Sequence, residues 1–335
     1  METYSLKLAT ALQQHAPVEV ISLPGRVDGS PPATMALLAF GLRAAMKLIT
    51  ARKPQGTVHV ADMASWPLAL AARMRSRSWR LALSAHGTDV SYPSRGGIKG
   101  RLYGAYLRLG ARWLGPAVVI ANSNSTAECV RRYGYRHVTV VPLATDMQPP
   151  PGPVGSPGYF VLFAGRLVER KGCAWFIRNV LPRLPEGLGL RVAGTIWSAS
   201  EGKALGAPRV DYVGAQDTEA IARLYATACC VVIPNLELPN GEFEGFGLVA
   251  TEASACGGVP LASACGGLRE AVIDKVTGFL LPPGEPEAWV DMIVEISQWS
   301  AQRRAAFVKR SVAETAARYS WTRVAQETFQ AYETR

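Results

Sequence analysis

Short apolar runs alternate with amphipathic stretches along almost the whole chain. The apolar runs, many of them rich in Val and Ile, predict strands at 18–23, 57–61, 80–85, 117–121, 137–142, 159–164, 190–193, 210–213, 230–234, 259–262 and 278–281. Apolar residues at helical spacing predict helices at 5–13, 36–51, 67–74, 102–113 and 125–133, from 173, near 247, and almost throughout 289–332. Strands that alternate with helices favour parallel sheets, so the predicted fold class is α/β with two Rossmann-like, doubly wound domains.

One segment interrupts this alternation. Residues 148–158, QPPPGPVGSPG, contain five prolines and three glycines without an apolar period, which is typical of a linker. The segment divides the chain into a first domain at 1–147 and a second domain that begins at 159. Two α/β domains joined by a proline-rich hinge imply a ligand-binding cleft between them.

Charge divides at almost the same place. Residues 1–150 contain 18 Lys and Arg against 7 Asp and Glu, a net charge of +11, whereas residues 151–335 contain 18 against 19, a net charge of −1. The excess positive charge of the whole chain, +10, therefore belongs to the first half. Such asymmetry suggests a nucleic acid, an anionic membrane or an acidic substrate as partner, with an ordinary solvated basic surface as the alternative.

Composition sets further bounds. No stretch reaches the ~18–20 apolar residues needed to cross a bilayer, and the start shows no signal-peptide pattern, so a cytoplasmic location is expected. None of the six cysteines forms a C-x-x-C pair, and only four histidines are available to join them in a metal site. We interpret the cysteines as buried structural thiols and expect no metal site.

Two glutamates, Glu244 and Glu252, enclose the sequence GFGLVAT. Gly245 and Gly247 let the backbone approach a ligand closely, and the following residues predict a helix that ends at the next glycine pair. A glycine loop that leads into a helix presents unpaired N–H groups and the positive end of the helix dipole, which suits a diphosphate. One carboxylate would then reach a sugar and the other the hydroxyls of a ribose. Two unrelated glutamates near an ordinary loop are the alternative.

A basic segment follows the first strand of the second domain. Residues 165–172, GRLVERKG, place Arg166 and Lys171 at the carboxyl end of that strand, where they would neutralise a leaving diphosphate. We interpret Arg170 as part of a basic surface turn. Further glycine-containing segments follow at 266–270, GGLRE, and at 277–283, TGFLLPP.

Together these motifs resemble the C-terminal domain of the large retaining GT-B glycosyltransferase family four, the glycosyl transferases group 1. The family pattern G-R-x-x-x-x-K-G, E-G-F-G-x-x-x-x-E-A, G-G-x-x-E and T-G-F-L-x-P-P is complete between 159 and 283, and in that order. The resemblance implies a GT-B fold with a nucleotide-sugar donor domain at 159–318. It also implies a closing helix at 319–335 that packs back on the first domain.

The resemblance assigns roles to individual residues. Arg166 and Lys171, next to Gly165, would bind the donor diphosphate, Glu244 would hold hydroxyls of the donor sugar, and Glu252 would bind the ribose. The glycine loop would contribute Gly245, Phe246, Gly247 and Leu248, the last three through their backbone amides. The backbone of 212–214 would flank the base.

The first half carries further matches. His86, in the sequence HGTD after the strand at 80–85, resembles the family residue beside the reacting centre and would contact the donor sugar. A loop histidine with a structural role is the alternative. Asn122 and Ser123 resemble the family segment V-x-x-S, and 142–146 resembles the end of the sixth strand, with Ala or Thr in place of the usual glycine.

The first residues, METYSLKLA, match the family segment G-G-M-E-x-Y-S-x-x-L-A from its methionine onwards. In relatives, a strand and a Gly-Gly loop precede this point, so the first domain is expected to lack its usual first strand. We hypothesise that Met1 is an internal methionine of a chain that begins roughly 15–25 residues earlier, with a genuine truncation as the alternative.

The expected activity is transfer of a hexosyl unit from a nucleoside diphosphate sugar to an acceptor hydroxyl, with retention, in bacterial cell-surface glycan or glycolipid assembly. The departing diphosphate would take the acceptor's proton, and neither a cofactor nor a metal is expected because the chain has no Asp-x-Asp cluster. Basic residues interleaved with Tyr and Trp at 95–113 suggest peripheral contact with the inner face of an anionic membrane, and a lipid-linked glycan acceptor.

Several alternatives belong to other classes. One is a non-catalytic nucleotide-sugar-binding protein, and another is a natural-product glycosyltransferase with a soluble acceptor. A sugar-phosphate synthase or a nucleotide-sugar epimerase would use the same architecture. A nucleic-acid-binding module explains the basic half but not the donor motifs, so no nucleic acid is expected as partner.

Overall fold

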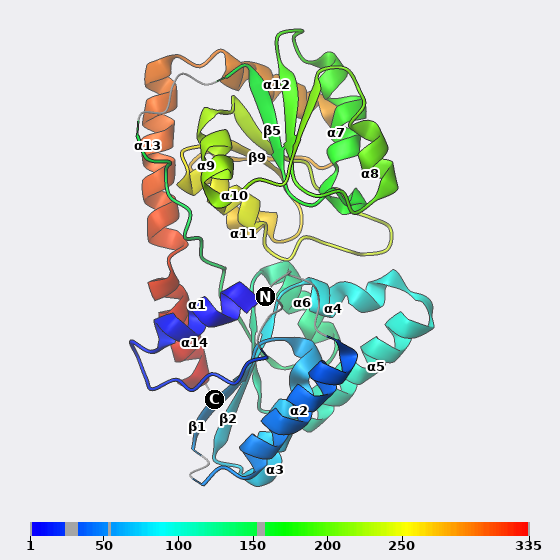
Figure 1. Ribbon diagram of the computed structural model, residues 1–335, viewed down its shortest axis with the longest axis vertical. Coiled ribbons are helices and arrows are strands. Elements are labelled where there is room, and N and C mark those ends of the chain that lie inside the picture. The colour runs from blue at the N-terminus through cyan, green and yellow to red at the C-terminus, as the bar shows by residue number, and fades with distance from the viewer. Residues whose placement is uncertain (1, 24–32, 53–54, 153–157, 334–335) are drawn as a thin grey trace. The chain divides into compact units, whose positions relative to one another are not determined.

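The computed structural model describes residues 2–23, 33–52, 55–152 and 158–333 (Figure 1). The chain divides into two compact units, and each is described by itself: unit 1 is Met1–Val141 with Trp321–Arg335, and unit 2 is Pro142–Ser320. The first division precedes the predicted linker at 148–158, of which 153–157 lie outside the described residues. The second division assigns the last helix, α14 (Trp321–Glu333), to unit 1.

Unit 1 is built on a parallel sheet. Its strands, in the spatial order β1-β2-β3-β4, are β1 (Gly56–Val60), β2 (Trp79–Ala85), β3 (Val118–Ala121) and β4 (His137–Val140). Its helices are α1 (Glu2–Leu12), α2 (Thr34–Ile49), α3 (Trp66–Arg75), α4 (Thr88–Ser91), α5 (Gly97–Trp113), α6 (Asn124–Arg132) and α14, with the short turns η1 (Met63–Ser65) and η2 (Tyr92–Arg95). Helices α3 and α14 both pack on the sheet. These bounds confirm the predicted elements of the first half, apart from 18–23.

The strand predicted at 18–23 is wrong. Residues 17–23 form neither helix nor strand, and two of their apolar side chains, Val20 and Ile21, are exposed to 48% and 38%. The run has the composition of a strand, but strand propensity reflects packing against neighbours rather than an intrinsic backbone preference. Without a partner strand in the described structure, the segment gains nothing from its β-branched residues.

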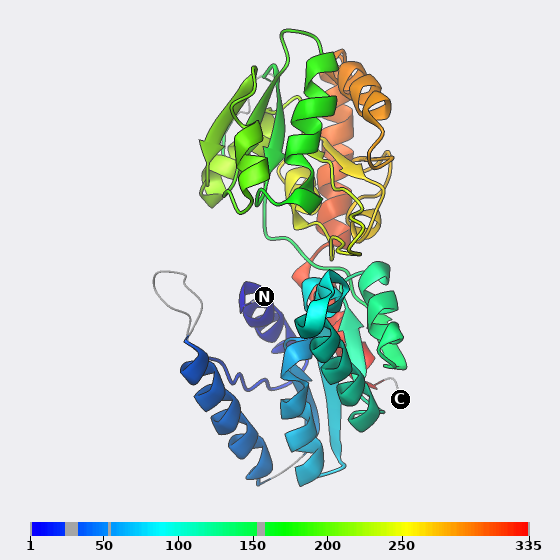
Figure 2. The same cartoon turned by 90° about the vertical axis from the view of Figure 1, so that its right-hand side faces the viewer.

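Unit 2 contains a larger parallel sheet with helices on both sides (Figures 1 and 2). The strands, in the spatial order β10-β9-β8-β5-β6-β7, are β5 (Phe160–Ala164), β6 (Gly189–Ala193), β7 (Val210–Gly214), β8 (Cys230–Ile233), β9 (Pro260–Ser263) and β10 (Phe279–Leu281). The helices are α7 (Cys173–Asn179), α8 (Ala199–Ala204), α9 (Thr218–Thr227), α10 (Leu248–Ala255), α11 (Leu268–Ala271), α12 (Pro286–Ser297) and α13 (Ala301–Arg318), with the turns η3 (Glu169–Lys171) and η4 (Leu181–Arg183). All strands predicted in the second half are present.

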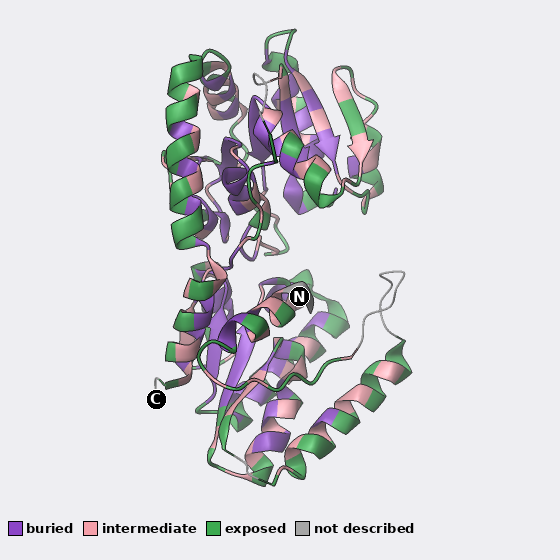
Figure 3. Cartoon of the chain, turned by 60° about the vertical axis from the view of Figure 1, so that its left-hand side comes forward, coloured by how far each residue is buried: buried purple, intermediate pink, exposed green. Residues whose placement is uncertain are grey.

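The central strands of unit 2, β5, β8 and β9, are buried on both faces, as expected of a parallel sheet covered by helices (Figure 3). Val161 and Phe163 of β5 pack in one core with Phe176 of α7 and Trp289 of α12. Helix α9 begins where the Asp217 carboxylate accepts a hydrogen bond from the Ala220 amide at 2.8 Å. The buried apolar core and the helix cap thus both stabilise the parallel sheet with its covering helices.

All six cysteines are free and buried, which confirms their interpretation as structural thiols. Among the described residues, no helix is both long and apolar enough to span a bilayer.

Candidate functional site

The order of strands in unit 2 reverses between β5 and β8. From β5 the chain moves outward through β6 and β7, then returns to the other side of β5 with β8, β9 and β10. In open α/β sheets, ligands bind outside the carboxyl ends of the strands at such a reversal. The segments that leave β5 and β8 carry Lys171 and Glu244, so the fold places these two predicted residues at the reversal.

Glu244 is the centre of a compact polar cluster. One oxygen of its carboxylate, Oε2, lies 2.5 Å from the Lys171 ammonium and 2.5 Å from Nη1 of Arg170. The same oxygen accepts a hydrogen bond from the Asn235 side-chain amide at 3.1 Å. The three ionised side chains are only 10–13% exposed. The cluster is therefore an ion triad with little access to water.

The triad determines the charge state of Glu244. Burial alone would raise the pKa of the carboxyl, but Lys171 and Arg170 outweigh burial and lower this pKa to about 2. Because the folded-state pKa lies below the ordinary 4.5, the ionised carboxylate stabilises the fold at neutral pH. That contribution is lost as the pH falls from about 4.5 towards 2.

The interpretation of Arg170 as a surface residue is wrong. Its side chain is buried and ion-paired, and its carbonyl accepts a hydrogen bond from the Leu236 amide at 2.9 Å. Both contacts join the turn η3 to the segment that follows β8. A buried cation requires a partner, and its partner Glu244 lies 74 positions away in the sequence. Nothing local in GRLVERKG distinguishes Arg170 from an exposed arginine.

Arg166 lies elsewhere. Its side chain is exposed, and its guanidinium is stacked over the ring of Trp197, 5.1 Å from the ring centre. Gly165 follows β5 directly, and its amide donates to Ala193 at the end of β6. The structure therefore brings Lys171 to Glu244, but holds Arg166 at the neighbouring strand end against an aromatic face.

The glycine loop leads into α10 as predicted. Gly247 has a φ of +99°, which is unfavourable for other residues, and Leu248 begins the helix. Phe246 is buried, with its ring against that of Tyr319, whereas Leu248 is 40% exposed. The positive end of the helix dipole thus lies in the same loop as the Glu244 cluster.

A second loop holds the first in place. The Gly267 amide donates to the Glu244 carbonyl at 2.8 Å, and a Cβ at Gly267 would lie 2.2 Å from the carbonyl oxygen of Gly245. The two glycine motifs are therefore in backbone contact, and only glycine fits at position 267. The motif at 266–270 supports the site rather than adding a side chain to it.

Glu252 lies about one turn into α10. Its carboxylate accepts a hydrogen bond from the Tyr225 hydroxyl at 3.4 Å, and burial raises its pKa. It has no part in the ion triad. A carboxylate with one long hydrogen bond retains capacity for further donors, such as ribose hydroxyls.

His86 belongs to unit 1, in the loop that follows β2. Its Nε2 lies 2.9 Å from the Ala61 carbonyl, which can only accept, so this nitrogen carries the proton. The His86 amide donates to the Asp89 carboxylate at 2.9 Å, and the Asn122 side chain donates to the His86 carbonyl at 3.1 Å. The HGTD motif and Asn122 thus form one hydrogen-bonded unit around this histidine, whereas the Ser123 hydroxyl accepts from the Thr126 amide at 3.1 Å and caps α6.

A partly buried hydrogen-bond chain lies next to His86. His59 of β1 contacts the Tyr332 hydroxyl of α14 through Nδ1 at 2.6 Å and the Ser84 hydroxyl of β2 through Nε2 at 2.8 Å. Ser84 also hydrogen-bonds Tyr4, whose ring packs edge-on against His86 with centres 5.0 Å apart. No local sequence pattern predicts this hydrogen-bond chain, because its members come from four separate elements.

Acid should destabilise unit 1 through His59. Burial and the nearby His86 lower the pKa of His59 to about 4 from the ordinary 6.5, so the unfolded chain takes up the proton first. Stability contributed by the neutral ring is present above pH 6.5 and is lost as the pH falls towards 4, up to about 3 kcal/mol. His59→Gln is expected to flatten this part of the pH–stability curve measured by chemical denaturation. His137→Gln, at an exposed position of β4, should leave the curve unchanged, and an equally steep curve in both variants would contradict the assignment.

Known families match both halves of the chain. Residues 158–298 match the family described as glycosyl transferases group 1, and residues 1–148 match glycosyltransferase family 4. The chain therefore belongs to the family four, group 1 glycosyltransferases, as the resemblance predicted.

Individual relatives agree with this assignment. The D-inositol 3-phosphate glycosyltransferase of Mycobacteroides abscessus is 38% identical over 126 residues, which cover 38% of this chain and 26% of the relative. An uncharacterised glycosyltransferase of Methanocaldococcus jannaschii is 32% identical over 181 residues, covering 51% and 44%. The chain thus spans less than half the length of these curated relatives.

Solved structures share the fold. The Anabaena protein HepE, in complex with UDP and glucose, superposes with a TM-score of 0.70 at 20% identity, over 97% of this chain and 88% of HepE. Sucrose-phosphate synthase from Thermosynechococcus elongatus gives a TM-score of 0.72 at 21% identity, over 99% and 92%. The two α/β units therefore constitute a GT-B fold, which confirms the predicted fold class.

Proposed function

We propose that this chain is a retaining hexosyltransferase that moves a sugar from a nucleoside diphosphate sugar to an acceptor hydroxyl. The observation that carries this proposal is the buried Glu244–Lys171–Arg170 triad at the strand-order reversal of unit 2. Glu244 of this triad lies in the loop that leads into α10. Cations and a helix N-terminus recognise a diphosphate, and a carboxylate recognises sugar hydroxyls.

The triad suggests how the donor is taken up. Lys171 is held by Glu244 in the structure, and a diphosphate that enters the site competes with the carboxylate for this cation. The carboxylate oxygens then become available to hydroxyls of the donor sugar. The loop amides of Phe246, Gly247 and Leu248 receive the phosphates, and Glu252 receives the ribose. Arg166 completes the diphosphate site by leaving the Trp197 ring.

The chemical step follows from this arrangement. The acceptor oxygen attacks the anomeric carbon on the face that the diphosphate leaves, and the bond from that carbon to the diphosphate oxygen breaks. The acceptor's proton passes to the departing diphosphate, whose negative charge is stabilised by Lys171 and the helix end. The family motif supports His86 as a further residue that contacts the donor sugar. These groups act without a metal ion, so EDTA is expected to leave the rate unchanged.

A nucleotide screen tests the proposal. Thermal unfolding is measured with UDP, GDP, ADP and dTDP and their common sugar conjugates, and one nucleotide family is expected to raise the midpoint. Release of the free diphosphate with transfer of the sugar then identifies an enzyme. Binding without release or transfer would instead support a non-catalytic nucleotide-sugar-binding protein, and no shift in a folded sample would contradict the donor site.

The acceptor is proposed to be a glycan or a lipid-linked glycan at the inner face of a bacterial membrane. Helix α2 supports membrane contact, because one of its faces exposes Met35, Leu38, Leu42 and Met46, each by more than half. Exposed apolar residues at helical spacing in a half of the chain with net charge +11 suit an anionic bilayer surface. Cosedimentation with anionic vesicles at low salt tests the contact. Failure to cosediment would favour a soluble acceptor, such as a natural-product aglycone.

A further inference from the structure

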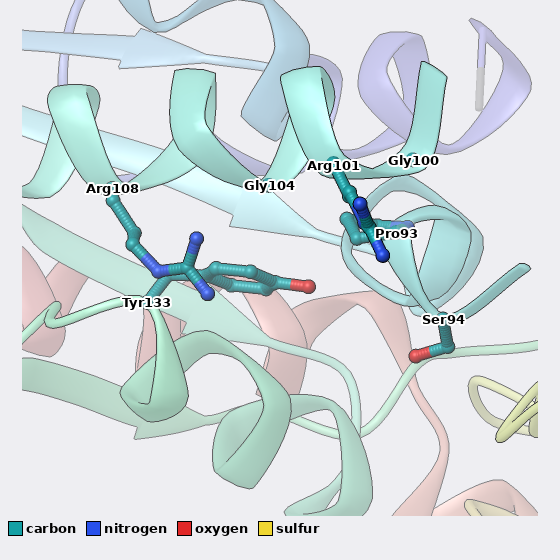
Figure 4. Close-up of a pocket in the computed structure, with 7 residues that line it drawn as sticks. All are labelled: Pro93, Ser94, Gly100, Arg101, Gly104, Arg108 and Tyr133. Atoms are coloured by element: carbon teal, nitrogen blue, oxygen red, sulfur yellow. The ribbon is translucent and has the colours of Figure 1, made fainter. Parts of the chain in front are cut away.

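Unit 1 contains a hollow that the donor site does not use. It lies between α5, the turn η2 and the end of α6, and has a volume of about 290 Å³ (Figure 4). Pro93 of η2 lies on one side, Gly100 and Gly104 of α5 on another, and Tyr133 closes the end nearest α6. This volume lies near the lower end of the range of small-molecule pockets, roughly 300–1,000 Å³.

Two glycines of α5, Gly100 and Gly104, line the hollow, and their surroundings differ. At Gly100 a Cβ would lie 2.9 Å from the Pro93 carbonyl oxygen, so close packing requires glycine there. At Gly104 the nearest atoms would be Pro93 Cβ at 3.5 Å and Nη1 of Arg108 at 3.8 Å, which is ordinary van der Waals contact. Alanine would therefore fit at 104 and would favour the helix. Close packing therefore does not require glycine at position 104, whereas an open hollow does, because a side chain there would fill it.

The hollow is strongly positive. Arg101 and Arg108 lie two turns apart on α5 and extend from the same face of this helix into the lining (Figure 4). Neither α5 nor the lining contains an acidic residue. Across the described ranges of the chain, neither guanidinium forms a salt bridge.

The Tyr133 ring positions the guanidinium of Arg108. Its guanidinium lies over the Tyr133 ring, 5.9 Å from the ring centre, and the Tyr133 hydroxyl donates to the Val90 carbonyl at 3.0 Å. Burial raises the pKa of this phenol to about 12, so it stays neutral and adds no competing negative charge. A guanidinium fixed on an aromatic ring keeps its planar fork of donors for an oxyanion.

We propose that this hollow binds a phosphate group, with Arg101 and Arg108 as its ligands on either side of Gly104. Two arginines without counter-charges match the two or three acceptor oxygens of a phosphate monoester. The phosphate belongs either to a small soluble molecule or to a lipid head group, since both present the same group. The site is independent of the proposed glycosyl transfer, because all its residues lie in unit 1 and the diphosphate cluster lies in unit 2.

Calorimetric titration of the full chain tests the site, with a nucleoside diphosphate present so that the donor site is filled. The probes are glycerol 3-phosphate, and phosphatidylcholine vesicles with and without phosphatidic acid. Arg101→Ala and Arg108→Ala are expected to weaken binding of the phosphate probe about tenfold or more. Arg112→Ala removes the same charge from an exposed position on the same helix, outside the lining, and should change binding less than twofold.

Gly104→Ala provides a test without a change of charge. The added methyl group occupies the hollow next to Arg108, so phosphate binding should fall about tenfold while the unfolding midpoint stays equal or rises. Binding of glycerol 3-phosphate with this dependence assigns a soluble phosphate, and binding of acidic vesicles alone assigns a head group. If neither probe binds, or if all three lining variants bind as Arg112→Ala does, the proposal is overturned. If nucleotides still raise the unfolding midpoint of these variants, that outcome does not bear on the proposed donor site.

Discussion

Glu244→Gln is expected to lower the rate of sugar transfer by about a hundredfold to a thousandfold while nucleoside diphosphate binds at least as tightly as before. Glutamine keeps the shape of the side chain but removes the negative charge that holds Lys171 and Arg170. A diphosphate can replace this charge, whereas the neutral amide cannot replace the carboxylate at the sugar hydroxyls. Turnover should therefore be lost without loss of nucleotide affinity.

The same substitution should reduce stability by about 3 kcal/mol, because it leaves two buried cations without their counter-charge. Nucleoside diphosphate should raise the unfolding midpoint of the variant by more than it raises that of the parent. Glu237→Gln, an exposed position in the same segment between β8 and α10, is the matched control and should behave as the parent. Parental turnover in Glu244→Gln would remove this carboxylate from the mechanism.

Gly267→Ala is expected to destabilise unit 2 by about 3 kcal/mol and to abolish the nucleotide-dependent shift. The backbone at 267 has a φ of −71°, which alanine adopts without strain, so the cost comes from contact alone. The new Cβ would lie 2.2 Å from the Gly245 oxygen and 2.6 Å from Phe246 Cα. The glycine loop must move away, and the amides at the start of α10 move with it.

Gly187→Ala is the matched control for this substitution, since a Cβ at 187 would meet no atom within 4 Å. It should leave both stability and nucleotide binding unchanged, as judged by chemical denaturation and thermal shift. A Gly267→Ala protein that unfolds at the parental midpoint and still responds to nucleotide would show that the two loops do not depend on each other.

The sequence predicts most elements of the fold because each repeats a local rule. Apolar runs become buried strands, and the loop at Gly247 starts a helix at the expected residue. Two misses have a common cause. The buried state of Arg170 and the hydrogen bonds of His59 depend on partners 74 and 273 positions away, which no local pattern reveals. The predicted roles of Arg166, Glu252 and His86 rest on family motifs, and they stay predictions.

Unit 1 is assembled from both ends of the described chain, with α14 packed against α1 and the sheet. During synthesis, α14 leaves the ribosome only after all of unit 2 has emerged. Unit 2 can therefore complete its core while the first sheet still lacks this helix and His59 still lacks Tyr332. Domains usually fold in the order in which they are translated. Here unit 1, which apart from α14 is translated before unit 2, is completed after it. A chain released before residue 321 would leave the sheet without the apolar residues that α14 packs on it, and so more exposed to quality-control proteases.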